Sequence, residues 1–204
     1  MSSERGTVPS PSRRVRPSTS PTLGDREREI LRQVAVDSIQ MGLEEGCPLP
    51  VVLERFPELL RTPGAVFVTL KQGNRLRGCI GSFQPRRSLV EDVSENAFAA
   101  AFRDPRFSPL TLEELPGLGV HLSLLSPLEP FPVKSRKDLV AWLERGRDGL
   151  LVEDGSRRSI FLPQVWESLP DPDDFLGELL LKAGLPRDYW SRDLVFHRYT
   201  VQEF

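Results

Sequence analysis

The chain has 204 residues, which fits one domain with a tail, because domains commonly contain about 100 to 200 residues. Its formal net charge of −2 gives no overall attraction to nucleic acid or to an anionic membrane. The two cysteines, Cys47 and Cys79, form no CxxC pair, which argues against a disulfide framework and against a structural zinc site. No stretch reaches the roughly 18 apolar residues of a membrane span, and Met1 to Asp25 lacks the apolar segment of a secretory signal. We therefore expect a soluble, cytoplasmic protein with reduced thiols.

The first 24 residues differ from the rest in composition. They are rich in serine, proline and arginine, with four arginines against one glutamate, and they contain almost nothing that a core could bury. We predict a disordered arm at residues 1–24 and a folded domain at residues 25–204. The arm could contact polyanions, or it could be no more than a solvated tail, and we do not expect nucleic acid to be a partner.

The folded part is expected to open with a helix and a β-hairpin. Apolar residues recur at helical spacing from Asp25 to about Leu43, and the segment Gly46 to Pro50 ends the pattern. The β-rich run Ala65 to Leu70 and a second run that begins at Arg75 flank the turn Gly73-Asn74. The pair predicts a hairpin whose second strand carries Cys79.

A buried helix is predicted next. Ser88-Leu89-Val90-Glu91 matches a capping box, in which the serine and the glutamate each bond to the other's main-chain amide. The helix should run to about Arg103, because the residue before proline in Asp104-Pro105 is pushed away from helical geometry. Small residues beside large rings in the segment 97–102 would allow this helix to lie close against a sheet.

The second half of the chain carries shorter elements of both kinds. Capping residues predict a short helix after Thr111, a helix from Ser135 to about Glu144, and a helix from Asp171-Pro172 that Gly184 ends. Apolar, β-rich runs predict strands at 120–125, 150–152, 159–162 and 194–201. Because helices do not regularly separate the strands, we predict an α+β fold with a mixed or mostly antiparallel sheet flanked by helices, and not a doubly wound nucleotide-binding fold. No phosphate loop, dinucleotide fingerprint or metal-binding helix occurs, so no cofactor and no metal is predicted.

The strand Leu76-Arg77-Gly78-Cys79-Ile80-Gly81 is the main candidate for chemistry. In a regular strand Arg77 and Cys79 would share one face, with Leu76, Gly78 and Ile80 on the other. A guanidinium beside a thiol favours the thiolate, and the glycines Gly78 and Gly81 would let a ligand approach the backbone. Cys79 is therefore a candidate nucleophile, and Arg77, Gly78 and Gly81 are candidate ligand-binding residues. The alternative is structural, since free cysteine is often buried and strand glycines often mark bulges or close packing.

Four polar residues around the end of the long helix are further candidates for ligand binding. Glu95 and Asn96 lie on an otherwise apolar helix, and Asp104 and Arg106 follow it, so these side chains could line a cleft beside Arg77. The alternative is a set of hydrogen bonds between helix and loop. Glu95 and Asp104 are too far apart for a catalytic carboxylate pair, because nine helical residues span roughly 13 Å.

A cysteine nucleophile usually needs a base, and the chain offers only His121 and His197. His121 lies opposite an apolar set in its predicted strand and could face a cleft. His197 shares a strand face with apolar residues and is better interpreted as a half-buried structural residue.

The sequence resembles the AMMECR family over nearly the whole length from Asp25 to Phe204. The resemblance rests on six ordered blocks, Leu76 to Gly81, Glu95 to Phe107, Leu125 to Pro127, Asp148 to Leu150, Phe161 to Val165 and Lys182 to Pro186. It implies an α+β fold with a larger and a smaller lobe around a cleft. Prokaryotic proteins of this kind resemble protein A of the AmmeMemoRadiSam system, so the resemblance implies a Memo-like protein and a radical SAM protein as partners.

Two positions depart from the family pattern. Many members carry histidine where this chain has Asp148, and cysteine where it has Leu180. These departures argue against a mechanism that needs either residue.

The sequence as a whole favours a module that binds a small anionic ligand or a partner peptide. The alternatives are a cysteine-dependent enzyme acting on a metabolite or nucleic acid, and a nucleic-acid-associated protein that uses its basic arm.

Overall fold

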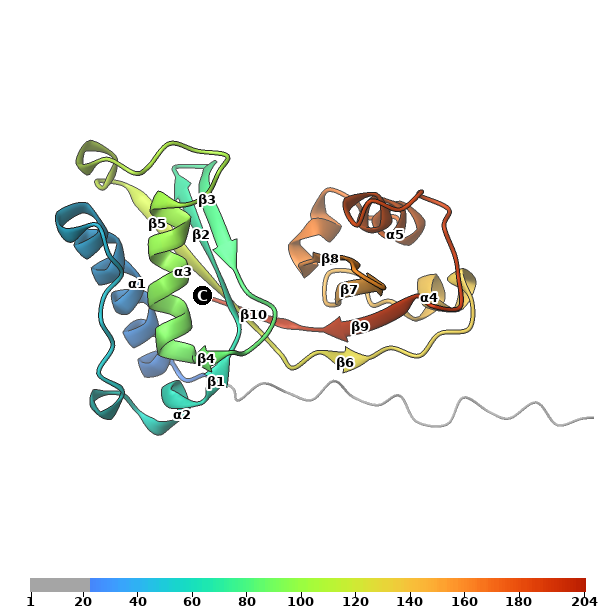
Figure 1. Ribbon diagram of the computed structural model, residues 1–204, viewed down its shortest axis with the longest axis horizontal. Coiled ribbons are helices and arrows are strands. Elements are labelled where there is room, and N and C mark those ends of the chain that lie inside the picture. Colours follow the sequence, from blue (N-terminus) through green and yellow to red (C-terminus); the bar gives the residue numbers. More distant parts are fainter. Residues whose placement is uncertain (1–22) are drawn as a thin grey trace, which may run out of the picture.

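Two lobes make up the computed structural model, which describes residues 23–204 (Figure 1). Each lobe is built on its own four-stranded sheet, with strand order β10-β5-β2-β3 in the first and β6-β9-β7-β8 in the second. Every strand pair in residues 23–204 for which a register is defined is antiparallel. The predicted α+β fold with antiparallel pairing and a smaller second lobe is confirmed.

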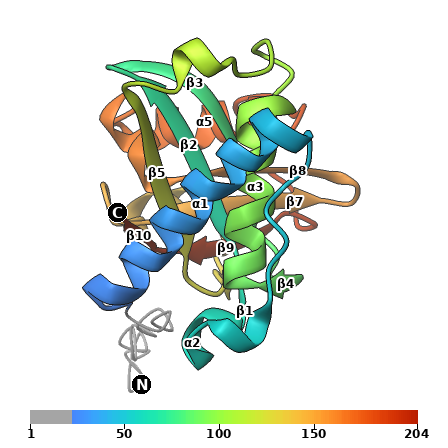
Figure 2. The ribbon, with the colours of Figure 1, turned by 90° about the vertical axis from the view of Figure 1, so that its left-hand side faces the viewer.

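The first lobe combines residues from most of the first 125 positions with the last strand of the chain. Its elements are α1 (Asp25–Glu45), η1 (Leu53–Arg55), α2 (Glu58–Arg61), β1 (Pro63–Gly64), β2 (Val66–Gln72), β3 (Arg75–Gly81), β4 (Arg87–Ser88), α3 (Leu89–Phe102), η2 (Leu112–Glu114), β5 (Leu118–Leu125) and β10 (Val201–Glu203). Helices α1 and α3 cover one face of the sheet, and the second lobe lies on the other side (Figures 1 and 2). The helix-covered face holds the larger core, with Leu31, Val68, Val93 and Leu122 all fully buried.

Local sequence signals explain the helix ends of this lobe. Helix α1 ends at Gly46, whose φ of 72° is the left-handed conformation that glycine adopts without a steric penalty. Helix α3 begins with the predicted capping box, because the Ser88 side chain accepts from the Glu91 amide and the Glu91 side chain accepts from the Ser88 amide. The predicted boundaries of both helices are confirmed to within a few residues.

The second lobe is smaller and packs helices against a sheet of short strands. Its elements are β6 (Glu129–Pro130), α4 (Arg136–Trp142), β7 (Gly149–Asp154), β8 (Arg157–Phe161), η3 (Pro163–Glu167), α5 (Pro172–Lys182) and β9 (Val195–Tyr199). Aromatic stacking marks its core, where the rings of Trp166 and Phe175 lie 3.8 Å apart between centroids. The predicted helix from Asp171-Pro172 is confirmed, with the Asp171 side chain accepting from the amides of the first turn.

The chain crosses between the lobes twice, and the second crossing corrects one prediction. The single strand predicted at 194–201 is wrong, because the chain leaves the second sheet after β9, passes Thr200, and joins the first sheet as β10. Ser126 ties the two crossings together: its amide donates to the Thr200 carbonyl at 2.8 Å, and its hydroxyl accepts from the Thr200 amide at 2.9 Å. A small apolar cluster that includes Ala65, Leu125 and the fully buried Tyr199 fills the junction.

The predicted arm at residues 1–24 lies almost entirely outside the described residues. Leu23, where the description begins, is only 1% exposed, and its amide donates to the Gln202 side chain on β10 at 3.3 Å. Among residues 23–204, no helix is both long and apolar enough to cross a membrane.

Candidate functional site

The strand that carries Cys79 is irregular, and this corrects the predicted alternation. Leu76 lies opposite Lys71 and Gly78 lies opposite Leu70, so two consecutive residues of β2 face residues of β3 that are two apart. Directly opposed residues share a face and consecutive residues do not, so Leu76 and Gly78 lie on opposite faces of the sheet. The expected grouping of Leu76 with Gly78 and Ile80 is therefore wrong.

Gly78 packs against helix α3. A Cβ atom at this position would lie 2.1 Å from the main-chain carbonyl oxygen of Ala100. Gly78 thus permits close packing of helix and sheet, which leaves its neighbour Cys79 on the other face, toward the second lobe. Gly81 is also a close-packing position, since its Cβ would lie 2.3 Å from the Phe67 ring.

Cys79 and His121 share the sheet face that is not covered by helices. Thr69 in β2 lies directly opposite Cys79 on one side and His121 on the other. The Thr69 hydroxyl donates to the Cys79 sulfur at 3.4 Å. Neighbouring strands lie about 4.8 Å apart, so Cys79 and His121 are separated by two strand spacings. The imidazole leans along its own strand, because its Nε2 would lie 3.4 Å from a Cβ at Gly119. His121 shares the face predicted for it but does not contact the thiol.

Asp104 and Arg106 hold the outer edge of the strand at Cys79. The Cys79 amide donates to Oδ2 of Asp104 at 2.9 Å, and Nη2 of Arg106 donates to the Cys79 carbonyl at 3.2 Å. Arg106 also pairs with Asp104 at 2.6 Å. This pairing holds the pKa of Asp104 well below its usual range, since Arg106 and the Cys79 amide both stabilise the carboxylate. The structure brings three predicted residues together, and the hydrogen bonds with Asp104 raise the pKa of Arg106.

Arg77 belongs to a separate ion pair. Its Nε and Nη2 donate to the two carboxylate oxygens of Glu114 at 2.6 and 2.9 Å, and Nη2 also donates to the Ser108 carbonyl. The guanidinium holds the pKa of Glu114 at about 2, with help from the Thr111 amide. Because this fork-shaped pairing satisfies most of the donors of Arg77, the residue fixes the loop after α3 to β3. Sequence reasoning missed Glu114, whose capping box with Thr111 was the only signal.

Lys182 on α5 of the second lobe is a cation on the side of the Cys79 strand that faces this lobe. Its Nζ donates to the Ile160 carbonyl at 2.9 Å and lies 5.1 Å from the centroid of the Phe161 ring. Partial burial of the amine lowers the pKa of Lys182, and the charge of Arg106 lowers it as well. Cys79 and Arg106 thus lie within electrostatic reach of Lys182. We call Thr69, Cys79, Arg106 and Lys182 the Cys79 site.

Glu95 and Asn96 lie away from the Cys79 site. The Asn96 amide donates to the Val66 carbonyl at 3.1 Å and to Asp92 at 3.0 Å, and the Glu95 carboxylate lies 3.6 Å from Arg87. Asn96 therefore joins α3 to the start of β2. This is a structural role, like the hydrogen bonding that the sequence indicated as the alternative to ligand binding. The structure does not bring either residue together with Arg77 or Cys79.

The second histidine and the two departures from the family pattern all lie in the second lobe. His197 belongs to β9, and its Nδ1 lies 3.8 Å from Glu153. Leu180 is fully buried in the core of this lobe. Asp148 is fully buried as well, its carboxylate accepts from the Glu144 amide at 2.9 Å, and burial raises its pKa. Asp148 and Leu180 are therefore both buried inside the second lobe in this chain.

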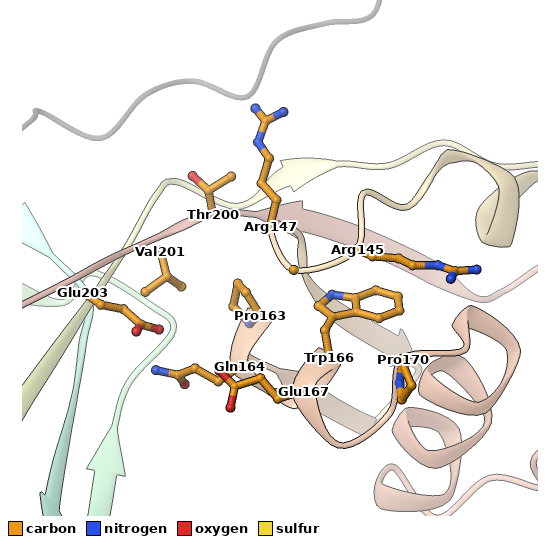
Figure 3. A pocket seen from close by; sticks show the side chains of 11 residues that line it. Arg145, Arg147, Pro163, Gln164, Trp166, Glu167, Pro170, Thr200, Val201 and Glu203 are labelled. Atoms are coloured by element: carbon orange, nitrogen blue, oxygen red, sulfur yellow. The ribbon is translucent and has the colours of Figure 1, made fainter.

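A pocket of about 790 Å³ lies between the lobes at the β10 side of the first sheet (Figure 3). It is lined by residues of the 145–147 turn, of the segment 163–170 and of the second crossing, namely Arg145, Gly146, Arg147, Pro163, Gln164, Trp166, Glu167, Pro170, Thr200, Val201 and Glu203. None of the site residues predicted from sequence lines this pocket. Cys79 belongs to β3, the opposite edge strand of the sheet.

Comparison with known proteins identifies relatives along most of the chain. The AMMECR1 family model matches residues 32–204. Protein MJ0810 of Methanocaldococcus jannaschii is 40% identical over 162 residues, which cover 76% of this chain and 79% of that protein. A protein of Thermotoga maritima is 37% identical over 149 residues, which cover 72% and 80% of the two chains. The crystal structure of the uncharacterized protein PH0010 from Pyrococcus horikoshii superposes with a TM-score of 0.79 at 36% identity, over 86% of this chain and 89% of that one. The chain belongs to the AMMECR1 family.

Proposed function

We propose that the Cys79 site binds a small anionic ligand between the two lobes. The observation that carries the proposal is that Arg106 from the first lobe donates to the Cys79 carbonyl, while Lys182 from the second lobe lies within electrostatic reach of both residues. Sites at domain junctions that combine a few fixed polar groups are typical of small-molecule binding.

Lys182 supplies the charge for this binding. Arg106 is already paired with Asp104, so those two charges compensate each other. Lys182 makes no ion pair with a carboxylate anywhere in residues 23–204 and donates only to a main-chain carbonyl and toward a ring. An anion beside Cys79 would therefore meet one uncompensated cation, a thiol and the Thr69 hydroxyl.

A cysteine-dependent reaction is the second candidate, with Cys79 as nucleophile on a metabolite or nucleic acid. It is favoured by the hydrogen bond from Thr69 to the sulfur and by the lowered pKa of Lys182, because an amine that loses its proton more easily can act as a base. Neither histidine is in contact with the thiol, so binding remains the first choice. We further propose that the protein works beside a Memo-like protein and a radical SAM protein, which its family resemblance supports.

Alkylation of the two cysteines with a charged and a neutral reagent tests the anion site. Iodoacetate is an anion and iodoacetamide is neutral, and both modify thiols. We expect the ratio of the iodoacetate rate to the iodoacetamide rate to be about fivefold higher at Cys79 than at the exposed Cys47, since one unit charge at 4 Å contributes about 1 kcal/mol in water. The site-resolved rates follow from peptide mass spectrometry.

Two variants complete the test. Lys182→Met should bring the Cys79 ratio down to that of Cys47, whereas Lys137→Met, which removes an exposed lysine from α4, should leave it unchanged. Equal ratios at both cysteines in the unmodified protein would contradict the anion site. A rate of iodoacetamide modification at Cys79 that rises with a midpoint well below about pH 8.5 would support the nucleophile.

A further inference from the structure

We infer that the pocket between the 145–147 turn and β10 is a second binding site, for zwitterionic molecules of the amino-acid or short-peptide class. Its volume of about 790 Å³ lies within the range of about 300 to 1,000 Å³ that small-molecule sites occupy. The pocket is separate from the Cys79 site, because the two have no residue in common.

The pocket carries charges of both signs on different walls. In Figure 3 Arg145 extends from the turn of the second lobe past Trp166, whereas Glu203 lies on β10 of the first lobe; Arg147, from the same turn, points away from the floor and pairs with Glu144. Arg145 and Glu203 make no ion pair with any residue in 23–204. Glu167, which lies on the lining segment 163–170, makes none with these residues either. The walls therefore do not neutralise each other. A ligand with a carboxylate at one end and an ammonium at the other would compensate both, which a simple anion or cation could not do.

The floor between these charges is apolar. Pro163 and Trp166 are buried residues, and Val201 faces them from the first lobe. The Gln164 amide stands at the boundary and lies within 3.4 Å of the Ser123 hydroxyl. An apolar side chain of the ligand would find a surface here, with the two charged ends at the walls.

The turn that carries the arginines is held firmly in place. The Asp148 carboxylate accepts from the Glu144 amide and the Asp148 amide donates to the Glu144 carbonyl, both at 2.9 Å. The Trp166 indole donates to the Asp148 carbonyl at 2.8 Å. The turn and the floor are therefore joined before any ligand arrives, which reduces the ordering that binding requires.

The probe is the tripeptide leucyl-alanyl-leucine with free termini. It is titrated into the full chain while the signal of the Trp166 indole N–H group is followed by nuclear magnetic resonance. The same tripeptide with an acetylated amino end and an amidated carboxyl end has the same apolar groups without the two charges. We expect the free form to shift the Trp166 signal in a saturable way and the blocked form to bind at least about tenfold more weakly. Free leucine is titrated in parallel: similar affinity would assign the site to amino acids, and weaker affinity to peptides.

Charge-removing variants locate the binding. Arg145→Gln and Glu203→Gln, both at exposed positions, should each weaken the free tripeptide about tenfold. The matched controls Arg157→Gln and Glu58→Gln remove exposed charges that do not line the pocket and should change nothing. Equal affinity of the blocked peptide, absence of binding by both the tripeptide and leucine, or indifference to both pocket variants would each overturn the inference.

Discussion

The carboxylate of Asp104 accepts a hydrogen bond from the main-chain amide of Cys79 at 2.9 Å, across the outer edge of the first sheet. An edge strand otherwise presents unpaired main-chain groups to solvent. Together with Arg106, which donates to the Cys79 carbonyl, Asp104 supplies the partners that a further strand would have given. The backbone of Cys79 is thereby fixed although it lies at an edge.

Removing this carboxylate should loosen Cys79. We expect Asp104→Ala to lower the free energy of unfolding by about 2 kcal/mol, because it removes charge-assisted hydrogen bonds from a buried side chain. Iodoacetamide should then modify Cys79 faster, with Cys47 unchanged as the internal control. Asp104→Asn keeps an oxygen for the Cys79 amide and should have the smaller effect. Unaltered Cys79 reactivity in a destabilised Asp104→Ala protein would show that the carboxylate does not position the strand.

The Arg77–Glu114 pair should be a stability element. We expect Arg77→Met and Glu114→Gln each to cost about 1 to 2 kcal/mol of unfolding free energy, since Arg77→Met removes both charge-assisted bonds at this partly buried position and Glu114→Gln removes the negative charge and one of the two acceptors. The double variant should lose less than the sum of the two single losses, because the residues act as a pair. Urea unfolding of the four proteins measures this coupling, and strictly additive losses would contradict it.

Gly78 should not tolerate any side chain. In Gly78→Ala the new methyl group would lie 2.1 Å from the Ala100 carbonyl oxygen, a main-chain atom that cannot rotate away. We expect a loss of about 3 kcal/mol, at the upper end of overpacking effects. The matched control is Gly119→Ala in β5 of the same sheet, where the nearest atoms are 3.4 Å and 3.6 Å away, and it should change stability by less than about 1 kcal/mol. Thermal or urea unfolding compares the two, and equal losses would refute the close contact between α3 and β3.

Asp92 should make stability depend on pH. Burial raises the pKa of Asp92 to about 6, against the hydrogen bond from the Val66 amide, the charge of Arg87 and the side chains of Ser82 and Asn96. A carboxyl whose folded pKa exceeds its unfolded value of about 3.9 holds its proton more tightly in the folded state. Its contribution to stability is therefore present below about pH 4 and is lost as the pH rises through about 6.

The measurement compares the protein with its Asp92→Asn variant, which cannot titrate at this position. Between pH 4.5 and pH 7.5 the unfolding free energy of the original protein should fall by about 2 kcal/mol relative to the variant, since one pKa unit corresponds to about 1.4 kcal/mol. Referring each value to the variant cancels the other titrating groups. A difference that does not change with pH would show that Asp92 is ionised throughout this range in the folded state.

Local signals in the sequence determined most of the secondary structure. The capping box at Ser88 and Glu91, the glycine after α1 and the Asp171-Pro172 pair each act within a few residues, so their effect can be read without knowing the fold. The same reasoning placed Asp104 and Arg106 just beyond α3, where they do meet Cys79.

Tertiary structure alone decided which distant groups meet. The irregularity in β3 separates Leu76 from the face of Gly78, because the register of a strand is set by its partner and not by its own residues. The continuous pattern at 194–201 became two strands in two sheets, since each half pairs with a different neighbour. Lys182 lies within electrostatic reach of Cys79 only because the lobes face each other. The sequence by itself thus determined most of the elements, including the strand that carries Cys79, whereas the approach of residues about 100 positions apart depends on the folded chain.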